Sequence, residues 1–175
     1  MERAEDKTIL VVDDEPNIRD YLSMVLEDAG FQVITAEDGE EALKQIKKKR
    51  PDFISLDLIM PRKSGHKLLY ELKKDKQLSR IPVLIVTAHA KDELGKADLE
   101  DLLDNRMMSG PGIYLEKPVN PLAYVRAIQR TLGIKETEGL KDKFSLKDEL
   151  QKSIQGASPE ALRKALEALK SSDDT

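Results

Sequence analysis

Five short apolar runs recur along the first two thirds of the chain, and stretches with helical periodicity separate them. The first run, Ile9-Leu10-Val11-Val12, is unbroken rather than alternating, as in a strand buried on both faces of a parallel sheet. The other runs are 31–36, 53–56, 83–86 and 113–115. Because a strict alternation of strand and helix implies right-handed crossovers, the sequence predicts an α/β fold, a doubly wound five-stranded parallel sheet.

Helix signals occupy the segments between these runs. The stretch 16–29 carries apolar residues on one face and stops at Gly30, a natural position for a helix C-terminus. Asp38, with Glu41 three residues later, forms a capping box for a second helix. Asn120-Pro121 provides an N-cap and a first residue for the last helix of this series. Apolar spacing predicts two further helices, one after 64–65 and one over 92–104.

The composition changes after Gly133. Residues 134–144 are polar and interrupted by Gly139, which is typical of a linker. Ser145 then caps a short helix, and Ser158-Pro159 opens another, both with apolar residues at helical spacing. The predicted organisation is a first domain over 1–133, a linker over 134–144 and an α-helical hairpin extension over 145–175. Its apolar stripe needs a cover, and the first domain, a second copy and another protein all stay open.

Composition and charge exclude several classes of function. A chain with 35% charged and 39% hydrophobic residues fits a soluble globular protein. The net charge of −4 gives no electrostatic reason to expect nucleic acid or an anionic membrane as a partner. The absence of cysteine excludes disulfides, thiolate ligands and cysteine nucleophiles. Because Met1 to Lys7 is charged and no run approaches the span of a bilayer, we expect a cytoplasmic protein.

Polar residues lie at the ends of four of the five apolar runs. Asp13-Asp14 follows the first, Asp57 the third, Thr87 the fourth and Lys117-Pro118 the fifth. Ligands of doubly wound sheets bind at the carboxyl ends of the strands, so these side chains are expected to face one crevice. Three carboxylates there must protonate or share a cation, and oxygen ligands favour Mg²⁺. A lysine and a threonine suit the oxygens of a phosphoryl group, which makes Asp57 a candidate nucleophile.

These motifs resemble the response-regulator receiver family, the chemotaxis-regulator-like switches of two-component signalling. The resemblance covers roughly Lys7 to Gly133 and implies a flavodoxin-like sheet in the order 2-1-3-4-5. It rests on Asp13-Asp14, on Leu56-Asp57-Leu58-Ile59-Met60-Pro61 with Gly65 four residues beyond, on Thr87-Ala88 and on Lys117-Pro118.

The resemblance also implies a role for each site residue. Asp57 would be the phosphoacceptor, Asp14 a direct Mg²⁺ ligand and Asp13 a ligand acting through water, with the backbone carbonyl of Ile59 completing the protein ligands. Thr87 would be the hydroxyl that moves toward the phosphoryl group, and Lys117 would be its counter-charge. Tyr114 would be the switch residue whose rotamer follows Thr87. A cis peptide is implied before Pro118, which proline makes acceptable energetically.

The expected function is therefore a phosphorylation-controlled switch. Asp57 would take a phosphoryl group from the phosphohistidine of a sensor histidine kinase or phosphotransfer protein. The face formed by the fourth helix, fifth strand and fifth helix would then control a partner protein or homodimer formation. Such a protein catalyses only its own phosphorylation and dephosphorylation. One alternative is a Mg²⁺-dependent aspartyl-phosphate phosphohydrolase, and another is a receiver-like scaffold that no longer phosphorylates.

Two features depart from the family pattern. The segment between Thr87 and Lys117 is longer than usual by roughly two helical turns, with the extra residues within 94–112. An altered fourth helix there would change the usual dimer arrangement. Ile59 places an apolar side chain where a polar one would help to orient attacking water, which predicts a long-lived phosphoryl state.

Overall fold

A computed structural model describes residues 3–88 and 114–172. The chain divides into two compact units, Met1–Thr137 and Glu138–Thr175. The helix expected over 92–104 and the extended segment 94–112 lie outside the described residues. Within them, no helix is both long and apolar enough to cross a membrane.

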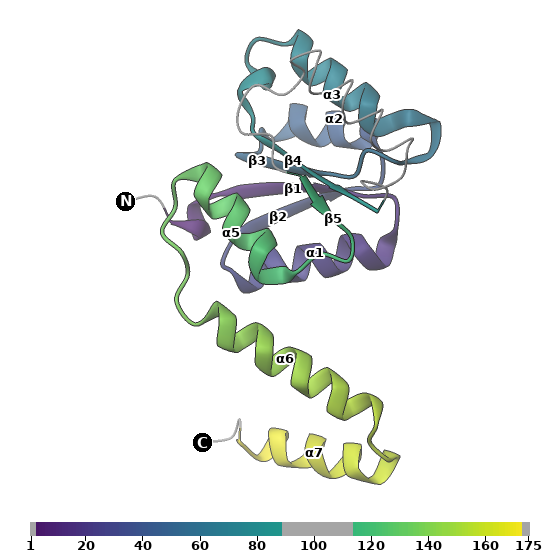
Figure 1. The fold of residues 1–175 in the computed structure, drawn as a ribbon, viewed down its shortest axis with the longest axis vertical. Helices are drawn as coiled ribbons and strands as arrows, with labels where there is room; N and C mark the ends of the chain where they lie inside the picture. The colour runs from purple at the N-terminus through teal and green to yellow at the C-terminus, as the bar shows by residue number, and fades with distance from the viewer. Residues whose placement is uncertain (1–2, 89–113, 173–175) are drawn as a thin grey trace. The chain divides into compact units, whose positions relative to one another are not determined.

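Five strands of the described part of the chain form one parallel sheet (Figure 1). They are β1 (Thr8–Val12), β2 (Gln32–Ala36), β3 (Phe53–Leu56), β4 (Val83–Thr87) and β5 (Tyr114–Glu116). Their order is β2-β1-β3-β4-β5, which confirms the predicted topology. Val12 of β1 lies beside Ala36 and Leu56, so the carboxyl ends of the three neighbouring strands are level. The residues that directly follow these three strands therefore lie at the same edge of the sheet.

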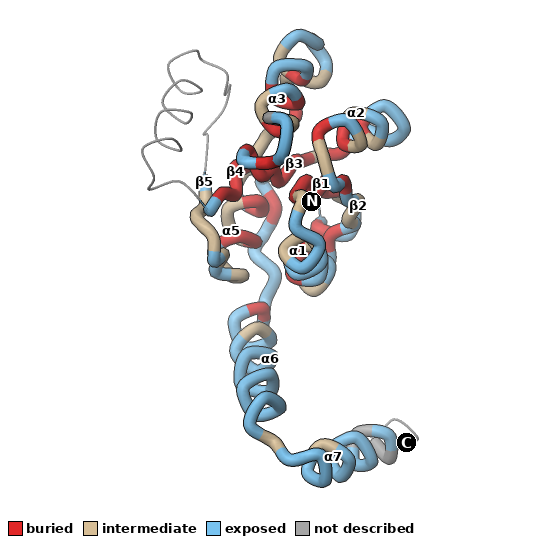
Figure 2. The backbone as a smooth tube through the Cα atoms, turned by 90° about the vertical axis from the view of Figure 1, so that its right-hand side faces the viewer, coloured by how far each residue is buried: buried red, intermediate tan, exposed pale blue. Residues whose placement is uncertain are grey.

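Helices cover both faces of the sheet (Figures 1 and 2). Helices α1 (Pro16–Asp28) and α5 (Pro121–Leu132) lie on one face, and α2 (Gly39–Lys48) and α3 (Ser64–Lys74) lie on the other. Every residue of β1 and β3 is buried, as the continuous apolar runs predict. Successive side chains of a strand point to opposite faces, so β1 contributes Leu10 and Val12 to the core under α2 and α3.

The ends of the helices follow the predicted signals. Asp38 accepts hydrogen bonds from the backbone N–H groups of Glu40 and Glu41, and the Glu41 carboxylate accepts one from Glu37 N–H. Asn120 Oδ1 accepts a hydrogen bond from Ala123 N–H at the start of α5. These caps fix where α2 and α5 begin relative to the sheet edge.

The second unit contains α6 (Leu140–Gln155) and α7 (Pro159–Ser172). The sequence predicts the first of these helices from Ser145, but it begins at Leu140, so the prediction of its start is wrong. Gly139 precedes the helix with φ 78° rather than interrupting a linker, and nothing in 140–144 disfavours helix. Leu146, Leu150 and Ile154 of α6 are exposed. The limits 1–133, 134–144 and 145–175 as domain boundaries stay a prediction.

Candidate acidic site at the carboxyl edge of the sheet

Three carboxylates meet beyond the ends of β1 and β3. One oxygen from each of Asp13, Asp14 and Asp57 lies within 4.8 Å of the others. Asp13 and Asp57 are buried, and Asp14 is half-buried. Because Val12 and Leu56 are register partners, the aspartates that follow them are held side by side by the sheet itself. The structure therefore brings together the three acids that the strand ends of the sequence single out.

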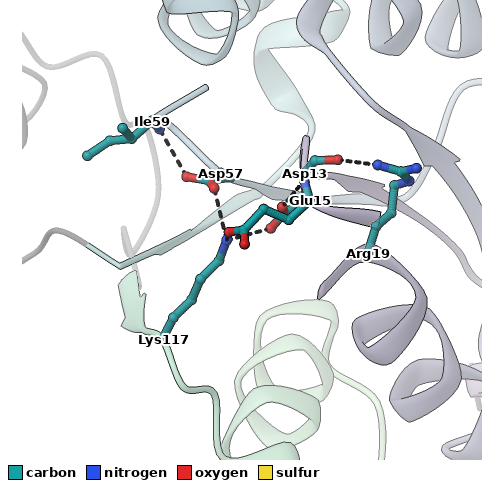
Figure 3. Close-up of polar contacts among 6 residues, drawn as sticks. All are labelled: Asp13, Glu15, Arg19, Asp57, Ile59 and Lys117. Atoms are coloured by element: carbon teal, nitrogen blue, oxygen red, sulfur yellow. Dashed lines mark hydrogen bonds and ion pairs between the residues drawn. The ribbon is translucent and has the colours of Figure 1, made fainter. Parts of the chain in front are cut away.

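The ammonium group of Lys117 contacts two of these acids, Asp13 and Asp57 (Figure 3). Lys117 Nζ is 2.8 Å from Asp13 Oδ2 and 3.0 Å from Asp57 Oδ2. Its side chain is 9% exposed. The Lys117 backbone N–H donates to the Thr87 carbonyl oxygen, and the Lys117–Pro118 peptide is cis. The loop after β5 is thus attached to the end of β4, which directs the lysine into the crevice.

Burial and charge shift the pKa values of both partners. Burial raises the pKa of Asp57, and this effect exceeds the lowering by the Lys117 ammonium and the Ile59 N–H. Burial alone would lower the pKa of Lys117, but the hydrogen bonds and charges of Asp13 and Asp57 outweigh it and raise that pKa above its usual range. The lysine therefore stays an ammonium at neutral pH, where it offsets part of the negative charge of the crevice.

The acid cluster has the donor set of a hard divalent cation. Its three clustered donors are all carboxylate oxygens, and their mutual distances of up to 4.8 Å are compatible with a single shared ion. Magnesium is held in this way, by carboxylates with water and phosphate oxygens completing its shell. The residues present therefore fit Mg²⁺.

Ile59 and the turn after β3 fix the orientation of Asp57. The Ile59 N–H donates to Asp57 Oδ1 at 2.9 Å, which leaves Oδ2 toward Lys117. The Ile59 side chain is 38% exposed. Gly65 lies against this turn, and a Cβ at Gly65 would stand 2.6 Å from the Asp57 carbonyl oxygen. Only glycine allows α3 to begin this close to the turn.

Thr87 and Tyr114 occupy neighbouring strands. Thr87 ends β4 and is buried, whereas Tyr114 begins β5 and is 50% exposed. In the register, Thr87 faces Glu116 and Tyr114 faces Ile85. Thr87 is attached to the site through its carbonyl, which accepts the Lys117 N–H. That the Tyr114 rotamer follows Thr87, and that the Ile59 carbonyl is a ligand, stay predictions.

Two residues of the site escape the sequence argument. Glu15 Oε1 lies 3.3 Å from Lys117 Nζ. Arg19 Nη1 donates to the Asp13 carbonyl oxygen at 2.7 Å, which holds the loop after β1 against the first turns of α1. A glutamate directly after Asp13-Asp14 is a visible signal, but its partner lies 102 residues away. Local patterns contain no information about such a contact.

Comparisons with known proteins agree with this geometry. The family model of the response regulator receiver domain matches residues 9–129. The phosphate regulon regulator PhoB of Escherichia coli is 35% identical over 129 residues, which are 72% of this chain and 53% of PhoB. The alkaline phosphatase synthesis regulator PhoP of Bacillus subtilis is 40% identical over 128 residues, 71% of this chain and 49% of PhoP. The chain thus spans about half the length of these transcriptional regulators.

Solved structures resemble the first unit. The chemotaxis protein CheY4 of Vibrio cholerae is 32% identical, with a TM-score of 0.60 over 71% of this chain and 98% of CheY4. The receiver domain of a sensor histidine kinase from Pseudomonas aeruginosa is 28% identical, with a TM-score of 0.62 over 73% of this chain and 98% of that domain. That structure has a magnesium ion coordinated in its active site cleft. The chain therefore belongs to the response regulator receiver family, whose members are phosphoacceptor switches that interact with histidine kinases or phosphotransfer proteins.

Proposed function

We propose that Asp57 is the phosphoacceptor of a Mg²⁺-dependent switch. An oxygen of Asp57 attacks the phosphorus of a phosphohistidine on a sensor histidine kinase or phosphotransfer protein. The new O–P bond forms as the P–N bond breaks, and the leaving imidazole nitrogen keeps the electron pair and takes up a proton. The product is an aspartyl phosphate on this chain and a free histidine on the donor.

The observation that carries this proposal is the pairing of buried Asp57 with the largely buried ammonium of Lys117, next to two further carboxylates. A lone surface aspartate would have neither a fixed ammonium nor neighbouring acids. The Ile59 N–H holds one Asp57 oxygen, so the carboxylate is oriented before any donor arrives. Lys117 Nζ, 3.0 Å from Asp57 Oδ2, is within reach of a phosphoryl oxygen added there.

The surrounding residues have separate tasks in this proposal. Asp13, Asp14, Asp57 and the Ile59 carbonyl would hold Mg²⁺, which when bound neutralises the carboxylates and stabilises charge on the transferring group. Lys117 neutralises a phosphoryl oxygen, and the Thr87 hydroxyl moves toward another. Tyr114, half-exposed at the start of β5, then follows the Thr87 hydroxyl and passes the change to the output face.

The output in this proposal is a protein contact. The switched face binds a downstream protein or a second copy of the chain, and the helices after the first unit take part or act as a docking appendage. The protein dephosphorylates itself and works in the cytoplasm. The net charge of −4 favours neither nucleic acid nor an anionic membrane as a partner for this chain.

Intact mass spectrometry tests the acceptor directly. The chain is incubated with acetyl phosphate and Mg²⁺, and we expect the mass of one phosphoryl group to be added. Asp57→Asn is expected to lose this addition. Asp75→Asn serves as the matched control, because Asp75 is exposed and an asparagine there can still accept the Gln77 and Leu78 N–H bonds. An addition that survives in Asp57→Asn removes Asp57 as the acceptor.

The same sample separates the alternatives. A scaffold that no longer phosphorylates would gain no mass in Mg²⁺. A phosphohydrolase would release many equivalents of phosphate per chain, and it would need its nucleophile in an Asp-x-Asp motif on the first strand. This chain has Asp13-Asp14 after its first strand instead, and Asp57, the third acid of the cluster, follows β3. Stoichiometric addition with slow release is therefore the outcome expected of the switch.

A further inference from the structure

Glu15 brings a further carboxylate to the Lys117 ammonium. Glu15 Oε1 lies 3.3 Å from Lys117 Nζ, next to the contacts of that nitrogen with Asp13 and Asp57 (Figure 3). The two partners differ in exposure, since the Glu15 side chain is 61% exposed and that of Lys117 is 9% exposed. Glu15 is thus a rim residue that reaches a largely buried charge.

The backbone around Glu15 is held in place from several directions. Its N–H donates to Asp13 Oδ1 at 3.0 Å, and its carbonyl accepts the Arg19 N–H at 2.9 Å. Arg19 also donates from its guanidinium to the Asp13 carbonyl. Pro16 follows at the first position of α1 with a restricted φ. The Cα of Glu15 therefore stays fixed while its side chain extends toward Lys117.

Glu15 occupies the N-cap position of α1 without acting as a cap. Its side chain makes no capping hydrogen bond. Serine, threonine, aspartate or asparagine would satisfy the helix N–H groups better at this position. A simpler reading is that the negative charge favours the helix N-terminus through the dipole. That reading accounts for a charge at this place but gives no role to the contact with Lys117.

The charges of the site give the contact with Lys117 a consequence. Among the described residues, the crevice and its rim combine the carboxylates of Asp13, Asp14, Asp57 and Glu15 with the ammonium of Lys117. A divalent cation entering this site is attracted by every one of these acids. An anionic phosphoryl group needs the same ammonium that Glu15 holds, and it is repelled by the Glu15 carboxylate.

We propose that Glu15 is a positioning residue that competes with the phosphoryl group for Lys117 while increasing the attraction of the site for Mg²⁺. This inference rests on the proposed function of Asp57. It makes Glu15 a determinant of how much phosphorylated protein accumulates at a given Mg²⁺ concentration. Removal of its charge should therefore move two binding equilibria in opposite directions, whereas a role confined to stabilising the start of α1 would leave both unchanged or weaken both.

The test compares Glu15→Gln with Glu27→Gln in the full chain. Both variants remove one negative charge from an exposed glutamate at α1, but residue 27 is about 18 Å further along the helix, beyond the screening length at physiological salt. Mg²⁺ affinity is measured by calorimetry. Beryllofluoride, which forms a tetrahedral analogue of a phosphoryl group on a carboxylate oxygen, is then titrated at saturating Mg²⁺ and followed by backbone amide shifts.

For Glu15→Gln we expect the Mg²⁺ dissociation constant to rise about threefold and that of beryllofluoride to fall about threefold, as suits an ion pair with one exposed partner. Glu27→Gln is expected to match the wild type in both titrations. A Glu15→Gln protein that equals the wild type, or that weakens both ligands, overturns the inference. A wild-type protein that fails to bind beryllofluoride at saturating Mg²⁺ counts instead against the proposed function, and the inference falls with it.

Discussion

Lys117 Nζ lies 3.0 Å from Asp57 Oδ2, so the candidate acceptor and its counter-charge form a largely buried ion pair. Asp13 Oδ2, 2.8 Å away, shares the same ammonium. One ammonium therefore offsets part of the negative charge of both buried carboxylates.

Lys117→Met should destabilise the metal-free protein more than it does the Mg²⁺-bound protein. Removal of the ammonium leaves Asp13 and Asp57 buried without their cation, which costs about 3 kcal/mol. Saturating Mg²⁺ should restore much of that loss. Urea unfolding in EDTA and in Mg²⁺ measures both values, with exposed Lys47→Met as the control. An equal loss under the two conditions would contradict this role.

The raised pKa of Asp57 predicts a pH dependence of stability. Burial raises this pKa in the folded state, so the folded protein binds more protons than the unfolded chain above about pH 4. The contribution of Asp57 to stability is therefore present below the unfolded pKa and is lost as pH rises through the folded pKa. In EDTA, the stability of Asp57→Asn relative to the wild type should increase from pH 4 to pH 8. A difference that is flat or decreases over this range would show that the pKa is not raised.

Gly65→Ala should lower the stability of the first unit. The added Cβ would meet the backbone of Asp57 and Leu58 at 2.6–2.9 Å, and main-chain atoms cannot move aside as a flexible side chain does. Overpacking of this kind costs about 1–3 kcal/mol. Gly156→Ala is the matched control, since the nearest atom outside its immediate neighbours would be 3.9 Å away. Thermal unfolding of the two variants should separate them, and equal midpoints would refute the close approach.

Ile59→Asn should shorten the life of the phosphorylated state. The apolar Ile59 side chain, 38% exposed near the acceptor, offers no hydrogen bond to an attacking water, whereas an amide can orient one. We expect a half-life of minutes or longer in the wild type and a severalfold shorter one in the variant. Phosphate release after removal of the donor measures it, with Met24→Asn as a control of similar exposure. A wild-type half-life of seconds would exclude the long-lived state.

A chain that ends at Gly133 should be less stable than one that ends at Thr137. Gln129 of α5 is buried, and its amide donates to Thr137 Oγ1, which in turn donates to the Ala29 carbonyl. Ile134 is also buried. Loss of these contacts should lower the free energy of unfolding by about 2–5 kcal/mol. Equal urea midpoints for the two truncated chains would place the boundary of the domain at Gly133.

The sheet and the acid cluster are predictable from sequence because each depends on strand ends. A continuous apolar run such as 53–56 identifies a buried strand, and parallel strands bring the residues that follow them, Asp13 and Asp57, to one edge. Capping residues such as Asp38 likewise have their effect within a few residues. These features are local or follow from the topology.

Contacts that depend on a side-chain rotamer or on a partner far along the sequence are not predictable in this way. The contact of Glu15 with Lys117 depends on the rotamer of an exposed side chain and on a loop 102 residues later. The hydrogen bond from the Gln129 amide to Thr137 Oγ1 is not predicted either, because the polar composition of residues 134–144 indicates only a linker. The start of α6 at Leu140 is not predictable from Gly139, because a glycine can either interrupt a segment or directly precede a helix.

The 60 residues that separate Asp57 from Lys117 matter while the protein is being made. A ribosome that has just passed Asp57 has already produced all three carboxylates of the cluster but not the lysine. Until Lys117 is made, mutual repulsion opposes a close approach of these acids without the ammonium that Asp13 and Asp57 share in the finished site. Lys117 can therefore balance the charge of this site only after all five strands have been synthesised.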